Sequence, residues 1–322
     1  MYKTNRSLLY PPPYGDLFPV LSALKDYAGL LRFHHYIKNL LIFIPLFFSL
    51  GFFNLRALAV SVLGFVVFSL LSSIVYVLND IRDIEKDRLH PAKRLRPLAS
   101  GRIPLRHARL TLGILAGALL VLVSLLGILE NRLSTWAGAG LLALYLALNI
   151  GYSYGLKNIP LVDITILASG YVIRVLFGAL IIGTSISVWL YLVITLGAYY
   201  LGLGKRRNEI TDTGGGSETR AVMRFYSHNF LDKNMYMCQA LCVVFYALWS
   251  IDAATVQRLH TGAFVYTIPL VLIILLKYSL IIEGASDGDP TSVVLHDKVL
   301  LLLCAVYVIW AFCIIYLNRS IP

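Results

Sequence analysis

The chain has 322 residues, of which 58% are hydrophobic and only 14% charged, and its mean hydropathy is +0.75. A soluble domain usually carries about 25% charged residues, so one water-soluble core cannot bury this much apolar surface. The composition excludes a soluble globular protein, a disordered protein and a disulfide scaffold. The formal net charge of +11 does not indicate nucleic acid binding, because basic residues gather in the cytoplasmic loops of helical membrane proteins. We therefore expect a polytopic membrane protein that binds no nucleic acid.

Apolar segments long enough to cross a bilayer follow a polar N-terminal tail. A spanning helix needs about 20 mostly apolar residues, and charged or Gly/Pro clusters separate such runs. We assign residues 1–29 to the tail and residues 30–322 to a single transmembrane catalytic domain. The expected fold is an all-α bundle of nine transmembrane helices. The expected spans are 39–53, 57–78, 107–128, 134–155, 161–183, 188–203, 235–252, 261–281 and 298–317.

The basic residues are distributed unequally between the two sides of the membrane. With the N-terminus in the cytoplasm, most of the 28 Lys and Arg residues fall on the cytoplasmic side. Those expected on the opposite side are Arg56, Arg132, Arg258 and Arg319. The expected cytoplasmic loops are 79–106, 204–234 and 282–297. We predict a multi-pass protein of the cell (inner or plasma) membrane, with a cytoplasmic N-terminus and an active site that faces the cytoplasm.

An acidic cluster follows the second expected span. Asn79, Asp83 and Asp87 are spaced i, i+4, i+8, so a helix places them on one face, which Asp80 also joins. Stacked acidic groups repel each other unless a cation lies between them, and Mg²⁺ uses one or two carboxylates together with substrate phosphates. We predict Asn79, Asp83 and Asp87 as metal ligands, and Asp80, Asp83 and Asp87 as catalytic residues. A solvated helix with alternating charges is the alternative.

Basic and aromatic residues surround this acidic cluster. Lys93, Arg94 and Arg96 follow it closely in the chain, and their cationic groups suit phosphate oxygens. Tyr76 and Tyr152 lie within about one helical turn of the predicted site and are expected to donate hydrogen bonds to the substrate. Tyrosines also line membrane interfaces without any catalytic role.

Further phosphate-binding candidates are Lys38, Lys157, Arg174 and Lys205. Arg174 lies inside the fifth expected span, where a charged side chain costs roughly 2.5–3.5 kcal/mol on insertion scales and usually marks a functional site. Lys38 and Lys157 lie at span ends, where a long side chain can simply extend its ammonium group to the interface. Lys205 is also consistent with the ordinary excess of cytoplasmic positive charge.

The acidic block resembles the first aspartate motif of the UbiA-type intramembrane prenyltransferase superfamily. The matching residues are Asn79-Asp80-x-x-Asp83-x-x-x-Asp87, followed by Lys93-Arg94-x-Arg96-Pro97. The resemblance implies a UbiA-like bundle of nine helices, whose members bind diphosphate through Mg²⁺ at the cytoplasmic helix ends. Ordinary members carry a second D-x-x-x-D motif, whereas in this chain Asp163 is followed at i+4 by Leu167.

Within that superfamily the chain is more similar to the decaprenyl-phosphate phosphoribosyltransferases. The matching stretches are Tyr36-Ile-Lys38-Asn39, 76–97, 152–157, Tyr171-Val-Ile-Arg174, Gly204-Lys205-Arg206 with Glu209, and 277–297. This resemblance implies Mg²⁺-dependent transfer of 5-phosphoribose from phosphoribosyl diphosphate to a polyprenyl (decaprenyl) phosphate, with release of diphosphate. The product would serve as an arabinan precursor in cell-envelope polysaccharide synthesis. The sequence leaves the oligomeric state open, a homo-oligomer included.

Two other functions compete with this interpretation. A conventional prenyltransferase would move a polyprenyl chain from its diphosphate to an aromatic or glycerol acceptor, and the incomplete second aspartate motif argues against it. A lipid transporter or flippase would be expected to carry acidic groups and broken helices near the middle of the membrane. Here the acidic residues gather at the ends of the spans instead.

Overall fold

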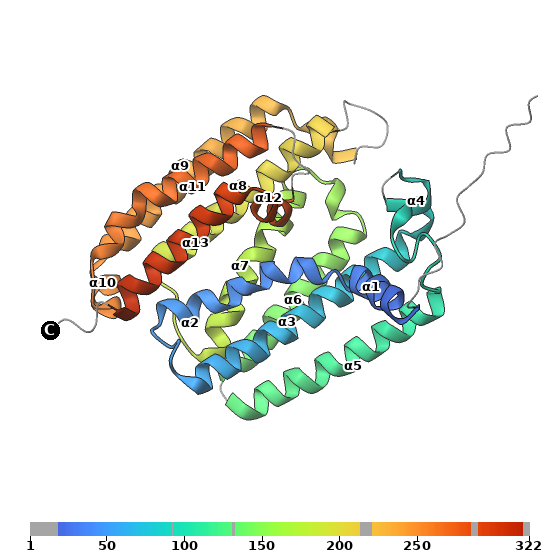
Figure 1. Cartoon of the computed structure of the whole chain (residues 1–322), viewed down its shortest axis with the longest axis horizontal. Coiled ribbons are helices and arrows are strands. Elements are labelled where there is room, and N and C mark those ends of the chain that lie inside the picture. The colour runs from blue at the N-terminus through green and yellow to red at the C-terminus, as the bar shows by residue number, and fades with distance from the viewer. Residues whose placement is uncertain (1–18, 92, 131–132, 213–220, 285–288, 318–322) are drawn as a thin grey trace, which may run out of the picture.

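The computed structural model describes residues 19–91, 93–130, 133–212, 221–284 and 289–317, and every regular element within these ranges is helical (Figure 1). The expected all-α fold is confirmed. Residues 1–18 of the expected tail lie outside the described ranges, and the rest of the tail belongs to helix α1 (Pro19–Leu31). The expected loops 204–234 and 282–297 also include residues outside these ranges.

Eight helical segments among the described residues are long and apolar enough to cross a membrane. They coincide with the expected spans from 57–78 onward, so the apolar runs predicted their places in the chain. They are α3 (Leu55–Arg82), α5 (Leu105–Glu130), α6 (Leu133–Ser153), α7 (Val162–Ile182), α8 (Val188–Asp212), α9 (His228–Ile251), η5 (Ala263–Thr267) with α11 (Ile268–Glu283), and α13 (Lys298–Phe312) with η6 (Cys313–Leu317).

The first expected span, 39–53, differs from the others. Its place is taken by a shorter apolar segment made of η1 (Phe33–Phe43) and α2 (Ile44–Phe48). The chain then turns through Leu50, whose backbone is left-handed (φ 64°), before α3 begins. This segment is shorter than the roughly 20 residues that a straight spanning helix needs. The count of nine spans and the cytoplasmic N-terminus therefore remain predictions.

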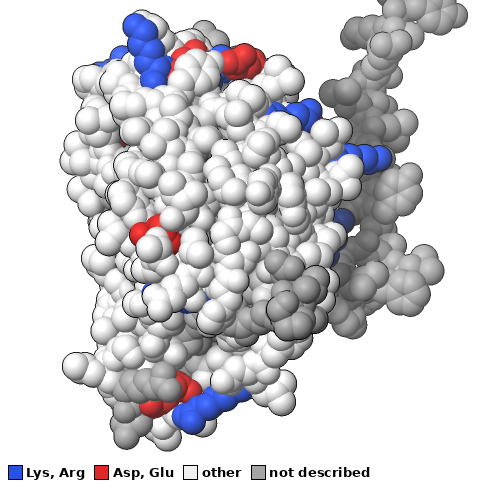
Figure 2. All heavy atoms as spheres, turned by 90° about the vertical axis from the view of Figure 1, so that its left-hand side faces the viewer, with Lys and Arg blue, Asp and Glu red and all other residues white. Residues whose placement is uncertain are grey.

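Helices α3 and α7 form the buried centre of the bundle. Helix α7 packs against α3, α6 and α8, while α9, α11 and α13 lie together on the other side of the molecule (Figure 1). The outer helix α5 instead exposes large apolar side chains such as Leu110 and Ile114. An apolar outer surface over satisfied helical backbone suits a hydrocarbon environment. Figure 2 shows the α10 (Ala253–Leu259) end, where Lys and Arg side chains are sparse.

A close helix crossing brings the N-terminal segment to the centre of the bundle. A Cβ atom added at Gly178 of α7 would lie 2.2 Å from the carbonyl oxygen of Ile42, so a glycine is needed at this crossing. The crossing holds η1 against α7, and Asn39 of η1 meets Arg174, one turn before Gly178. Packing of two apolar elements thereby positions two polar side chains.

Short helices cover the opposite end from α10. Asp289 is the N-cap residue of helix α12 (Pro290–His296). Because α12 packs against η1, its first residues lie at the centre of this end of the bundle. The short elements there are α4 (Ile84–Leu89), η2 (Lys93–Leu95), η3 (Leu156–Asn158), η4 (Ala221–Phe225) and α12 (Pro290–His296).

Candidate active site

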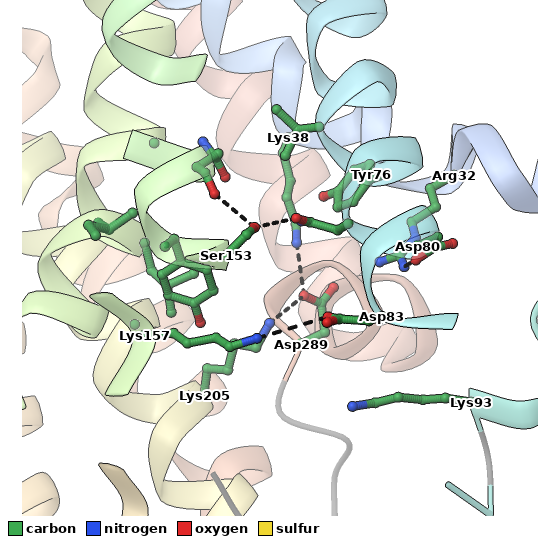
Figure 3. A pocket seen from close by; sticks show the side chains of 18 of the residues that line it. Arg32, Lys38, Tyr76, Asp80, Asp83, Lys93, Ser153, Lys157, Lys205 and Asp289 are labelled. Atoms are coloured by element: carbon green, nitrogen blue, oxygen red, sulfur yellow. Dashed lines mark hydrogen bonds and ion pairs between the residues drawn. The ribbon is translucent and has the colours of Figure 1, made fainter. Parts of the chain in front are cut away.

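A cavity of about 520 Å³ opens at this end of the bundle. Small-molecule sites usually measure about 300–1,000 Å³, so the cavity is large enough for a substrate. Its walls come from η1, α3, α4, η2, α6, the α6–η3 turn, α7, α8 and the start of α12. Figure 3 shows charged side chains from these separate elements pointing toward one another.

The acidic block does not form one continuous helix. Helix α3 ends at Arg82, Asp83 occupies the junction, and α4 begins at Ile84. Asp83 still accepts and donates helical backbone hydrogen bonds, with Asn79 on one side and Asp87 on the other. The four polar residues of the block therefore stay at one end of α3, and all of them line the cavity.

Arginine side chains hold two of the predicted acidic residues. Asp80 accepts hydrogen bonds from Arg32 Nη2 at 2.7 Å and from Arg96 Nη1 at 3.2 Å. Arg96 Nη1 also donates to Asp87 Oδ2 at 2.7 Å. Both carboxylates are buried. A buried carboxylate needs such a partner, so Arg96 joins the basic cluster to the acidic block instead of standing apart from it.

The other two polar residues of the block face groups from α6 and η3. The hydroxyl of Ser153 donates to Asn79 Oδ1, and Lys157 Nζ lies 3.9 Å from Asp83 Oδ2. Within the part of the chain that the structure describes, no group of three or more His, Cys, Asp or Glu side chains is arranged to hold a metal ion. The predicted ligand set of Asn79, Asp83 and Asp87 therefore remains a prediction.

Three lysines and Asp289 form the centre of the cavity (Figure 3). Asp289 Oδ1 lies 2.8 Å from Lys38 Nζ and 3.7 Å from Lys205 Nζ, and Lys157 points toward the same region. Burial alone would raise the pKa of Asp289, but the ammonium groups of Lys38 and Lys205 outweigh it and hold this pKa well below its ordinary value. Asp289 is therefore an ionised carboxylate at neutral pH.

Arg174 lies in the interior of α7 and lines the cavity with its guanidinium. Its Nε donates to Asn39 Oδ1 at 2.7 Å, its Nη1 to the carbonyl of Gly170 at 2.5 Å, and its Nη2 to the Tyr145 hydroxyl at 3.3 Å. The guanidinium carbon also lies 4.7 Å from the ring centroid of Phe68. These contacts orient the guanidinium with neutral groups, and no carboxylate among the described residues lies within 4.0 Å of its nitrogen atoms.

A buried ionic network supports the cavity wall beside Tyr152. Arg206 Nε donates to Asp163 Oδ2 at 2.7 Å, its Nη1 to Glu209 at 2.6 Å, and its Nη2 to the Tyr152 hydroxyl at 2.9 Å. Tyr226 donates to the second oxygen of Asp163 at 2.6 Å. Asp163 is fully buried and is absent from the cavity lining, so its contacts are structural.

The UbiA prenyltransferase family model matches residues 40–296, which include the acidic block and most of the cavity. The chain belongs to the UbiA prenyltransferase family. The UbiA membership expected from the aspartate motif is confirmed.

Relatives of this UbiA protein carry a more specific name. The decaprenyl-phosphate phosphoribosyltransferase of Corynebacterium glutamicum is 33% identical over 298 residues, which cover 91% of this chain and 86% of that protein. The protein of the same name from Mycolicibacterium smegmatis is 32% identical over 287 residues, covering 85% and 87%. The expected resemblance to this group is confirmed.

The fold is also that of a solved UbiA structure. A UbiA homolog from Archaeoglobus fulgidus, bound to DMAPP and Mg²⁺, aligns with a TM-score of 0.64 at 19% identity. The alignment covers 90% of this chain and 99% of that one. At this identity the similarity establishes the UbiA arrangement of helices.

Most of the predicted site residues meet at the cavity, although they come from distant parts of the chain. Arg94 is different, because its side chain is exposed and does not line the cavity. The lining residues that meet there are Lys38, Tyr76, Asn79, Asp80, Asp83, Asp87, Lys93, Arg96, Tyr152, Lys157, Arg174 and Lys205. The structure adds Arg32, Asn149, Ser153, Tyr171 and Asp289 to this lining. Ser153, Tyr171 and Asp289 lie within the stretches that carry the family resemblance, whereas nothing in the sequence indicated Arg32 or Asn149.

Proposed function

We propose that this UbiA protein transfers a 5-phosphoribosyl group from phosphoribosyl diphosphate to decaprenyl phosphate or a similar polyprenyl phosphate, and releases diphosphate. The observation that carries the proposal is the alignment with relatives of that name over most of both chains. The cavity supports it, because lysine and arginine side chains suited to several phosphate groups surround carboxylates suited to a metal ion and to hydroxyl groups.

The oxygen atoms at the end of α3 fit Mg²⁺. This ion usually takes one or two carboxylates together with substrate phosphates and keeps several waters, so a cage of three acidic residues is unnecessary. We assign Asp83 as the carboxylate ligand, with Asn79 as the neighbouring oxygen. Asp87 belongs to the set only if it exchanges Arg96 for the ion. When bound, Mg²⁺ would neutralise negative charge on the leaving diphosphate.

The lysines then bind phosphate oxygens directly. Lys157 lies beside Asp83, so it is placed to contact the diphosphate of the donor. Lys93 lies at the edge of the cavity, apart from the central lysines (Figure 3), where it can guide an anionic donor into the cavity. Positive groups around the leaving diphosphate stabilise the charge that develops as the bond to the sugar breaks.

The acceptor needs little activation by the protein. A lipid phosphate is already anionic at neutral pH, so its oxygen can attack the sugar carbon without a general base. Arg174 lies in the interior of its span, where its guanidinium can hold an anionic phosphate group that enters the cavity.

The two substrates differ in solubility, because phosphoribosyl diphosphate is water-soluble and the acceptor is a lipid. We therefore infer that the cavity opens toward the cytoplasm at the plasma membrane, and that the product feeds cell-envelope polysaccharide synthesis.

The experiment that tests the proposal uses membranes that contain the protein, Mg²⁺ and decaprenyl phosphate. Ribose-labelled phosphoribosyl diphosphate should transfer label to the lipid phase, and membranes without the protein should not. A parallel reaction offers a labelled polyprenyl diphosphate with an aromatic acceptor. Label in the aromatic product alone would replace our proposal with conventional prenyl transfer.

A further inference from the structure

We infer that Asp289 is a specificity-determining residue whose carboxylate accepts a hydrogen bond from a ribose hydroxyl of the donor. This inference rests on the proposed function and deepens it, because it says how the cavity selects a sugar diphosphate. The contacts of Asp289, its position at the start of α12 and the engagement of the other carboxylates support it.

The position of Asp289 at the start of α12 is the first support. Aspartate at a helix N-cap usually accepts a hydrogen bond from a backbone amide of the first turn. The Asp289 side chain makes no such capping bond. It instead extends to Lys38 of η1, 251 positions away in the chain, and toward Lys205 of α8. The start of α12 therefore presents a carboxylate to the cavity centre.

The charge of this carboxylate is the second support. Lys38 and Lys205 alone would attract phosphate groups strongly, and an adjacent carboxylate lowers that attraction by repelling the same groups. In direct contact with a diphosphate, the Asp289 carboxylate would contribute only this repulsion. A ribose ring, in contrast, brings hydroxyl donors that need acceptors, and an ionised carboxylate accepts about four hydrogen bonds. His35 Nδ1 also lies 3.9 Å from the second oxygen of Asp289, so the groups around this carboxylate are donors, as a ribose hydroxyl is.

The engagement of the other cavity carboxylates is the third support. Asp80 and Asp87 are held by Arg32 and Arg96, and Asp83 is the proposed metal ligand beside Lys157. Asp289 differs from these three in its position, because it lies between Lys38 and Lys205 at the centre of the cavity. An isoprenyl chain carries no hydroxyl donor, so a prenyl diphosphate cannot make this bond. The same residue therefore favours the sugar donor and disfavours the prenyl donor.

The experiment compares donors that differ by one hydroxyl. We would measure kcat/KM with phosphoribosyl diphosphate and with its 2-deoxy and 3-deoxy analogues, for the native protein and for Asp289→Asn. Hydrogen bonds to charged groups contribute enough for a discrimination of roughly 10- to 100-fold. The native protein should discriminate against at least one analogue by this factor, and the same factor should fall to a few-fold in Asp289→Asn.

Asp297→Asn is the matched control. Asp297 is also an N-cap residue paired with a lysine, Lys277, at 2.9 Å, but it does not line the cavity. This variant should discriminate like the native protein. Unchanged discrimination in Asp289→Asn would overturn the inference. If the Mg²⁺ requirement of this variant also rose, Asp289 would be a metal ligand instead. Tighter binding of the donor by Asp289→Asn would also overturn it, since Asp289 would then only compete with phosphate. Failure of the proposed function is distinguishable, because the native protein itself would not use phosphoribosyl diphosphate.

Discussion

The guanidinium of Arg206 lies 2.7 Å from the carboxylate of Asp163, and neither side chain is exposed. This pair joins α8 to the start of α7 beside the cavity, and the third nitrogen of the same guanidinium holds Tyr152. Removing one member of a buried ion pair leaves the other charged and unsatisfied, which usually destabilises a protein by about 3–5 kcal/mol.

We therefore expect Arg206→Met to lower the free energy of unfolding by about that amount. Thermal denaturation of the purified protein in detergent measures the loss. Glu85→Gln is the control, because Glu85 forms an exposed pair with Arg88 that should contribute at most about 1 kcal/mol. Equal loss in the two variants would contradict a structural role for the Arg206 network.

Arg174 gives a prediction about binding instead of folding. Arg174→Leu should fold and insert at least as well as the native chain, since an apolar side chain is less costly within a span. It should nevertheless be inactive, because the phosphate contact is lost. Arg174→Lys keeps the charge but cannot reproduce the planar set of donors, so it should weaken phosphate binding more than folding. Activity and donor affinity retained by Arg174→Leu would refute the assignment, and its failure to fold would make Arg174 structural.

The two acidic residues Asp83 and Asp87 should differ in their response to Mg²⁺. Both alanine variants should lose transfer, by at least about a hundredfold in kcat if the metal contact is removed. In Asp83→Ala the Mg²⁺ concentration for half-maximal activity should rise, because a ligand is missing. In Asp87→Ala the main effect should come from Arg96, which loses its 2.7 Å partner. Near-normal turnover of Asp83→Ala at saturating Mg²⁺ would contradict the metal-site assignment, and near-normal turnover of Asp87→Ala would show that the contact of Asp87 with Arg96 is not needed for transfer.

The depressed pKa of Asp289 predicts a pH dependence of stability. A carboxylate whose pKa is lower in the folded state adds stability that is complete above its unfolded pKa of about 4 and is lost as pH falls through the folded value. The stability difference between the native protein and Asp289→Asn should stay constant from about pH 7 to 5 and shrink below about pH 4. Thermal denaturation across this range checks it. A difference that disappears already between neutral pH and about 6 would show that Asp289 is not held ionised.

The sequence predicted the local features and missed the long-range ones. Hydropathy placed the spans after the first and put the acidic block at the end of one of them. The spacing of Asn79, Asp83 and Asp87 predicted a single helix, whereas α3 ends at Arg82 and α4 begins at Ile84. The meeting of Lys38 with Asp289 was not predictable, because it depends on how η1 crosses α7 at Gly178 and how α12 packs on η1.

Arg206 shows the same limit. In the chain it is one of several basic residues after a span, which is the ordinary signal for a cytoplasmic loop. Only the packing of α8 against α7 shows that it is fully buried on Asp163. Arg94, two residues before Arg96, was expected to bind phosphate for the same reason that Arg96 was, but the short turn around η2 leaves it exposed.

Transfer of the intact 5-phosphoribosyl group is the central claim, and a doubly labelled donor tests it most directly. The purified protein in lipid nanodiscs would receive Mg²⁺, decaprenyl phosphate and phosphoribosyl diphosphate labelled in the ribose and, with a second isotope, in the 5-phosphate. The account predicts that both labels enter the lipid in equal amounts while one diphosphate is released into water for each lipid product. Lipid without ribose label, or ribose label without the 5-phosphate label, would contradict it.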